Sequence, residues 1–477
     1  MPEKIRKVVP VFIAVTLLIA AGCKKEEKAR PRLVSEEELK EMQQELFKIV
    51  ERNRGKKCPR PVLRGEPLPG TAAADIQAVV EGTDDTRACH QALEETSDMV
   101  FEALDHPEDY RPEGYPARLN RTPKPQSQAP QELLELEKTC APVLLRLRKA
   151  VRHEDACSPY LPGLHDQPGY IPAIRTSRLA ASMARRLFAE GNAEQGFDLL
   201  LDVVRFGQDF GRGGTSLLET MIGVACIRTV LPMLEYGLNR KQPLDQSLLS
   251  RIEKELGQLI ETQPHPAEYL HGEMEAMATY TLNPEKKSPD TITIGADERD
   301  DNALALIALH ETSADVLSGC KPEDPPIRCE EHVRKVAERY RKSHQGDLEQ
   351  AAAMLRVAVS PDKVAAVRRE IIDILKAVAA PAHDRYLRHE GQTRFRLAGL
   401  RLLAAYRRLA EKAKACPKAA VFEQEPLSGL RTDPFSNQPI RVEELGPGRF
   451  ALWCPVPLGK PNKEKAEPAV FIDCPYR

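Results

Sequence analysis

The sequence predicts a mainly α-helical protein, a multi-helix array of antiparallel hairpins that ends in a small C-terminal β-hairpin module. Two observations predict this fold class. Apolar residues recur at helical spacing through most of the 477-residue chain, and after residue 415 proline, glycine, β-branched and aromatic residues replace the helix formers. A hydrophobic content of 42% is enough to bury substantial cores.

Residues 1–22 have the order of charge and polarity that the export machinery reads. Three basic residues precede an apolar run from Val8 to Ala21. This run is too short to span a bilayer core of about 30 Å, so it predicts a cleaved signal peptide rather than a transmembrane helix.

The signal ends in Ile19-Ala20-Ala21-Gly22-Cys23, which resembles the lipobox of bacterial lipoproteins, with Ala20 where leucine is commonest. The resemblance implies that Cys23 is lipidated, for example by palmitate, and becomes the first residue of the mature protein. Acyl chains contribute about 0.8 kcal/mol per buried CH₂, enough for a stable membrane anchor. The alternative is an ordinary secretory signal followed by a chance cysteine.

Residues 23–34 are expected to form a short solvated tether. Lysine at position 24, where aspartate marks inner-membrane retention in Gram-negative lipoproteins, implies an outer-membrane location facing the periplasm or the surface. The predicted localisation is therefore the cell envelope, and the membrane is the first expected partner.

Helices follow in series from Ser35, whose side chain can cap the backbone while Glu38 completes a capping box. Six prolines between residues 106 and 130 interrupt the pattern. We therefore expect an N-terminal helical region with a proline-rich linker over 35–125 and a main helical domain over 126–415. Further amphipathic helices are predicted at 86–105, 129–153, 172–190, 193–210, 216–238, 245–262, 266–281, 301–318, 328–357, 361–389 and 392–414.

Small residues and a tight connection predict one helical hairpin in particular. Ala180, Ala181 and Ala184 lead into Glu190-Gly191-Asn192, after which an apolar face returns. This hairpin resembles a single tetratricopeptide unit, and a chance hairpin is the alternative. The stretch 178–273 also resembles an uncharacterised bacterial family of large exported helical proteins. That resemblance implies architecture and no activity.

The last module, residues 416–477, reads as a β-hairpin with a Gly446-Pro447-Gly448 turn, preceded by Asp433-Pro434-Phe435-Ser436. It resembles the terminal module of the same helical family and, more loosely, the C-terminal hairpin of type II secretion pseudopilins. Pseudopilins bind calcium in an acidic loop that residues 455–460 do not supply. Neither calcium nor a pilin role is therefore expected.

Cysteine parity predicts disulfides. Of 11 cysteines, lipidation consumes Cys23 and leaves ten in a compartment that permits disulfides. Connectivity does not follow from spacing, but Cys320–Cys329 is the favoured bridge, Cys454 and Cys474 are expected to close the last module, and Cys226 is expected to be a buried thiol. The remaining candidates lie in neighbouring pairs along the chain: Cys58 with Cys89, and Cys140 with Cys157.

Charge and motifs exclude several classes of function. Removing the signal leaves 66 basic and 70 acidic residues, a formal charge of −4, which argues against nucleic acid as a partner. Spacings for zinc, a nucleophile elbow and a phosphate-binding loop are missing, so no metal, cofactor or catalytic residue is predicted. The histidines and acids at 265, 268, 271 and 275 are read as a solvated helix face.

Two hypotheses of function remain. The favoured one is a non-enzymatic, lipid-anchored helical protein that acts as a scaffold or binds a protein or peptide partner. The alternative is an envelope hydrolase with a site in the helical domain, for which His271 and Glu273 are the candidate polar cluster.

Overall fold

The structure is a computed structural model that describes residues 58–95, 131–156, 171–212, 217–270, 314–343, 361–455 and 470–476, together with a few single positions between them. Within these ranges the protein is mainly helical, with a small antiparallel sheet near the C-terminus, as the sequence predicts.

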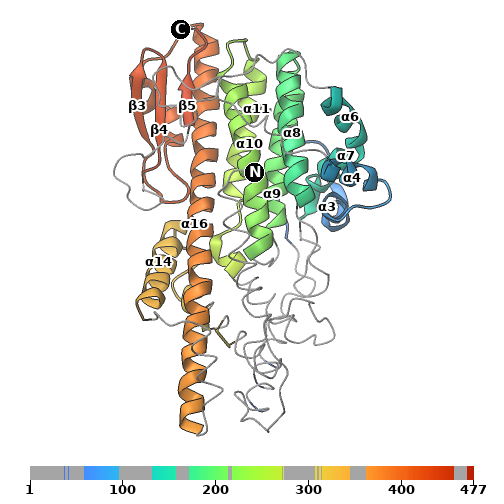
Figure 1. The fold of residues 1–477 in the computed structure, drawn as a ribbon. Coiled ribbons are helices and arrows are strands. Elements are labelled where there is room, and N and C mark those ends of the chain that lie inside the picture. Colours follow the sequence, from blue (N-terminus) through green and yellow to red (C-terminus); the bar gives the residue numbers. More distant parts are fainter. Residues whose placement is uncertain are drawn as a thin grey trace.

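Four helices and one much longer helix stand side by side as the body of the molecule (Figure 1). The predicted hairpin is confirmed, because Gly191 adopts a positive φ of 86° between its two helices and Asn192 begins the second. The five helices are α8 (Ile171–Ala189), α9 (Ala193–Phe210), α10 (Leu217–Asn239), α11 (Gln246–Glu261) and α16 (Pro361–Ala413).

Helices α9 and α10 touch backbone to backbone at two glycines. A Cβ on Gly223 would lie 2.2 Å from the carbonyl oxygen of Gly207, and one on Gly207 would lie 2.6 Å from that of Gly223. Only glycine permits this approach. Helix α10 is also long and apolar enough to cross a membrane, but much of it is packed inside the body.

Helix α16 is one continuous helix of 53 residues, so the prediction of separate helices over 361–389 and 392–414 is wrong. Gly391 lies inside the helix and is buried, and tertiary packing outweighs its poor helix propensity. Helix α14 (Pro326–Ser343) packs beside the N-terminal half of α16 (Figure 1).

The N-terminal elements lie on the far side of α8 from α16 (Figure 1). The predicted helix 129–153 is divided at Cys140, with Pro142 in the first turn of its second part, and it ends in a short strand. The elements are β1 (Leu68–Thr71), α3 (Ala73–Val80), α4 (Arg87–Glu95), α6 (Gln131–Thr139), α7 (Ala141–Ala150) and β2 (His153–Asp155), with β1 and β2 paired in parallel.

The predicted β-hairpin is confirmed as β3 (Arg441–Gly446) and β4 (Arg449–Trp453), and a third strand, β5 (Val470–Asp473), pairs with β4. Two short helices, η2 (Ala419–Glu423) and α17 (Leu427–Leu430), precede them. The sheet lies against the C-terminal half of α16, where a Cβ on Gly399 would meet Val470 at 2.7 Å (Figure 1).

The described residues form two apolar clusters. The larger one extends from α3 through the helical body to β4 and β5. The smaller one lies between α14, the N-terminal half of α16 and Tyr269. Helix α16 contributes to both clusters.

Candidate functional site

Polar side chains converge inside the smaller core and form what we call the Tyr269 cluster: Tyr269, His383, Tyr386, Glu390 and Arg394. Four of these residues come from α16, where the spacing of three or four residues places them on one face. Tyr269 belongs to a separate helical segment over 266–270. All five are at most 5% exposed.

Aromatic contacts hold this cluster together. The ring of Tyr269 stacks on His383 with centroids 6.2 Å apart and meets the edge of Tyr386 at 4.3 Å. Arg394 donates from Nε to Glu390 Oε1 at 2.9 Å and also donates to the carbonyl of Pro264. The arginine therefore ties α16 to the start of the 266–270 segment.

Burial sets the protonation of these groups. It lowers the pKa of His383 to about 4, so the imidazole is neutral at neutral pH. Burial, together with the nearby carboxylate of Glu390, raises the pKa of Tyr386 well above its ordinary value. His383 Nδ1 has no hydrogen-bond partner among the described residues. A neutral histidine and a neutral phenol packed away from solvent suit a structural core better than proton transfer.

A second set of buried charges lies where three helices end. Arg60 donates to Asp209 from Nε at 2.9 Å and to the carbonyls of Ala150 and Val151, at the end of α7. Arg212 donates to Asp209 at 3.2 Å. Cationic side chains are favourable beside the carboxyl ends of helices, where the dipole is negative.

Arg205 completes this arrangement at the end of α11. Its Nη1 donates to Thr262 Oγ1 at 2.8 Å, while Arg212 donates to the carbonyl of the same residue. Burial lowers the pKa of Arg205 to about 9. Arg60, Arg205, Arg212 and Asp209 thus join the ends of α7, α9 and α11, which is a stabilising role.

The predicted polar cluster cannot be placed, because His271 and Glu273 lie outside the described residues, as does Cys23. Their neighbours His265 and Glu268 begin the 266–270 helical segment. The backbone N of His265 donates to Glu268 Oε1 at 3.1 Å, and His265 Nδ1 accepts from the N of Ala267. These two side chains therefore cap a helix.

The disulfides in the structure do not join the cysteines that neighbour each other along the chain, contrary to the prediction. Cys89 bonds Cys140, because the division between α6 and α7 lies against α4, and this excludes bridges from Cys58 to Cys89 and from Cys140 to Cys157. Cys157 itself lies outside the described residues.

The C-terminal module is also closed differently from the prediction. Cys474 bonds Cys416 rather than Cys454, because β5 lies beside the segment that follows α16. Cys454 is partly exposed just after β4. Cys226 is a buried thiol, as predicted, and burial raises its pKa to about 12.

The two cysteines of the favoured pair, Cys320 and Cys329, are free thiols in the structure, and both are buried in the smaller core. Among the described residues, no group of three or more histidine, cysteine or acidic side chains is placed to hold a metal ion.

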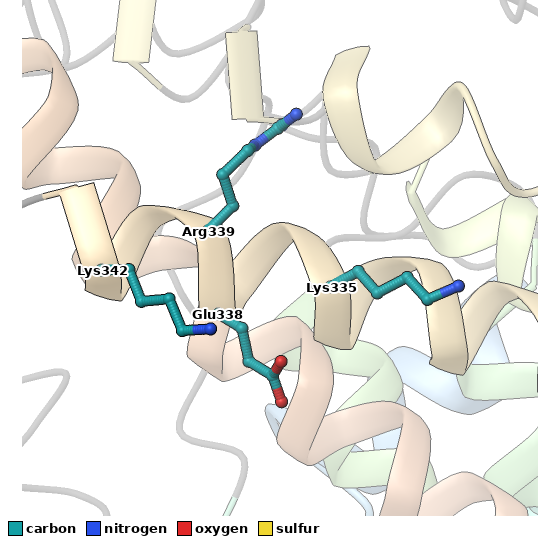
Figure 2. A pocket seen from close by; sticks show the side chains of 4 residues that line it. All are labelled: Lys335, Glu338, Arg339 and Lys342. Carbon is teal, nitrogen blue, oxygen red and sulfur yellow. The ribbon is translucent and has the colours of Figure 1, made fainter.

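A surface hollow lies away from the Tyr269 cluster, on the outer side of α14. Figure 2 shows the four long charged side chains that line it, Lys335, Glu338, Arg339 and Lys342. Arg339 leaves the helix in a different direction from the two lysines and pairs with Asp315 at 2.9 Å. The hollow is open, so it offers a charged contact surface rather than an enclosed reaction site.

Sequence reasoning missed the Tyr269 cluster, although a signal for it exists. His383, Tyr386 and Glu390 recur at helical spacing within a long helical pattern, which marks a polar patch on one face.

Comparison of the chain with protein-family models, curated proteins and solved structures gave no match.

Proposed function

We propose that this chain is an exported protein, anchored to the outer membrane by a lipid on Cys23, whose helical body acts as a non-enzymatic scaffold for a protein or peptide partner. The proposal begins from the signal and lipobox-like sequence over residues 1–23. It also draws on the resemblance of residues 178–273 to large exported helical proteins.

The observation that carries the proposal is the pair of disulfides. Cys89–Cys140 and Cys416–Cys474 join positions 51 and 58 residues apart. Stable disulfides of this kind belong to oxidising compartments outside the cytosol. The N-terminal export signal and the long-range disulfides independently support a location outside the cytosol.

The chemistry of the interior supports a scaffold. Asp209 is shared by Arg60 and Arg212, and Glu390 pairs with Arg394 within α16, so these buried carboxylates are engaged in ion pairs. The hollow on α14 supplies an open charged face of the kind that suits a protein partner.

The alternative, an envelope hydrolase, is favoured by one observation. His383 is a buried histidine with a depressed pKa beside two tyrosines, and such groups gather at active sites. Hydrolysis of a generic ester or peptide substrate that is lost in His383→Gln but retained in His265→Gln would support the enzyme and overturn the scaffold.

The anchoring experiment uses the full chain in a Gram-negative host supplied with labelled palmitate. We expect the label on the wild type in the outer-membrane fraction, and we expect Cys23→Ser to be unlabelled. Cys226→Ser is the matched control and should remain labelled, because its thiol is buried. A Cys23→Ser variant that still carries label would overturn lipid anchoring.

The scaffold is tested by photo-crosslinking in the same cells. A photoreactive residue at Lys335, in the hollow on α14, should give a discrete crosslinked band. The same residue at Lys254, on the exposed side of α11, should not. Equal patterns from both positions would contradict a partner surface on α14.

A further inference from the structure

Two buried thiols meet where α14 begins. Cys320 is 4% exposed and Cys329 is fully buried, and both belong to the smaller apolar core. The neighbouring Cys320 thiol raises the pKa of the Cys329 thiol, so the two side chains lie close together in this core. Neighbouring cysteines in one core are the arrangement that a disulfide requires.

The backbone that presents Cys320 is held firmly against α14. A Cβ on Gly319 would lie 2.2 Å from the ring of His332, so glycine is required for this approach. His332 Nε2 donates to the carbonyl of Asp315 at 2.6 Å and lies 3.3 Å from Ser318 Oγ. Because His332 lies one turn after Cys329 on the same face of α14, these contacts bring Cys320 close to Cys329.

The segment between the thiols carries contacts to two other parts of the fold. The N of Ile327 donates to the carbonyl of Phe435 at 3.0 Å, and the carbonyl of Asp324 lies 3.1 Å from His265 Nε2. A covalent bond between Cys320 and Cys329 would therefore help to hold the C-terminal module and the 266–270 segment to α14.

We propose that Cys320 and Cys329 form a third disulfide in the mature protein, made by thiol–disulfide exchange with the disulfide of an envelope oxidoreductase. One thiolate attacks the donor disulfide to give a mixed disulfide and one donor thiol. The second thiolate then attacks the protein sulfur and releases the other donor thiol. The two cysteines lose two protons and two electrons, and the donor disulfide is reduced to two thiols.

This proposal rests on the proposed export, because the exchange requires an oxidising compartment. The disulfide must also form before the segment is buried, for the following reason. The neighbouring Cys320 thiol and burial raise the pKa of the Cys329 thiol, which disfavours the reactive thiolate in the folded protein. The bond therefore forms while the segment is still accessible.

The test is a disulfide map of the full-length exported protein. The protein is denatured in N-ethylmaleimide without reductant and digested with trypsin, which does not cut between Lys321 and Pro322. Cys320 then lies in peptide 300–328 and Cys329 in peptide 329–334, each with one cysteine. We expect these two peptides as one linked species that separates on reduction.

Two other cysteine positions serve as internal controls. Peptides 88–118 and 139–146 should be linked through Cys89–Cys140, and peptide 213–228 should carry maleimide on Cys226. In the variant Cys320→Ser, peptide 329–334 should carry maleimide.

The outcomes separate the two proposals. Maleimide on both 300–328 and 329–334, with Cys89–Cys140 intact, would overturn the third disulfide and leave export standing. Linkage of 329–334 to any other peptide would overturn it as well. Maleimide on Cys89 and Cys140 too would overturn both the third disulfide and the export proposal.

Discussion

Asn239 of α10 pairs with Phe471 of β5 as a neighbouring strand would. Its Nδ2 donates to the Phe471 carbonyl at 3.0 Å, and its Oδ1 accepts from the N of Asp473 at 2.9 Å. Glu235, one turn earlier, accepts from the N of Phe471 at 2.8 Å. The outer edge of β5 is thus satisfied by a helix, which protects it from pairing with another chain.

We predict that Asn239→Ala destabilises the protein by about 1 to 3 kcal/mol, because it leaves a backbone donor and a backbone acceptor of β5 without partners. Urea denaturation followed by circular dichroism measures the change. Gln246→Ala, which removes an exposed hydrogen bond to the Arg408 carbonyl, is the control and should lose less. Equal losses in the two variants would contradict the strand-like pairing.

We predict a larger loss for Asp209→Ala, about 3 to 5 kcal/mol, because Arg60 and Arg212 would lose their buried carboxylate. Glu253→Ala, which removes a partly exposed partner of Arg408, is the control and should cost less than about 1 kcal/mol. Chemical denaturation of both variants at neutral pH provides the comparison. Similar losses would show that the Asp209 pairs add nothing beyond a surface pair.

The buried His383 predicts a dependence of stability on acidity. Its pKa is about 4 in the folded protein and 6.5 unperturbed, so between these values the unfolded chain binds more protons. Stability from this group is complete above about pH 6.5 and falls as the pH drops toward 4, by about 3 kcal/mol in all.

The measurement compares wild type with His383→Gln across that range, because other groups titrate there too. Burial raises the pKa of Asp202 to about 6, so that carboxyl acts in the opposite direction and is common to both proteins. The difference in unfolding free energy between the two proteins should shrink on acidification. A constant difference from pH 7 to pH 4 would show that His383 is not buried as described.

We predict that Gly223→Val destabilises the protein by about 1 to 3 kcal/mol or more, since the side chain would displace α9 from α10. Lys254→Val, at an exposed position of α11, should cost only the difference in helix propensity, roughly 0.5 kcal/mol. Thermal unfolding of the two variants measures both effects. A Gly223→Val protein as stable as the control would contradict the close helix contact.

Local signals were sufficient for the hairpin of α8 and α9. The Gly191-Asn192 connection and the apolar faces on either side predict α8 and α9 to within a residue, because turn chemistry and periodicity are encoded nearby in sequence. The hairpin of β3 and β4 follows in the same way from Gly446 and Gly448, both of which have positive φ.

Long-range features were not predictable in this way. Cysteine spacing does not show that α4 lies beside the start of α7, so it could not pair Cys89 with Cys140. The breaking tendency of Gly391 is local, whereas the packing that keeps α16 continuous comes from distant residues. The Tyr269 cluster likewise depends on a long-range contact, because Tyr269 lies far along the chain from the residues of α16 that it packs against.

The length of α16 has a consequence for how the molecule unfolds. At 1.5 Å per residue its 53 residues extend about 80 Å. Phe395 and Leu402 lie in the larger core, while Tyr386 and Leu387 lie in the smaller one. Because both cores pack on the same helix, unfolding of either core would disrupt α16 and so destabilise the other. The two cores should therefore unfold cooperatively, in a single calorimetric transition rather than two.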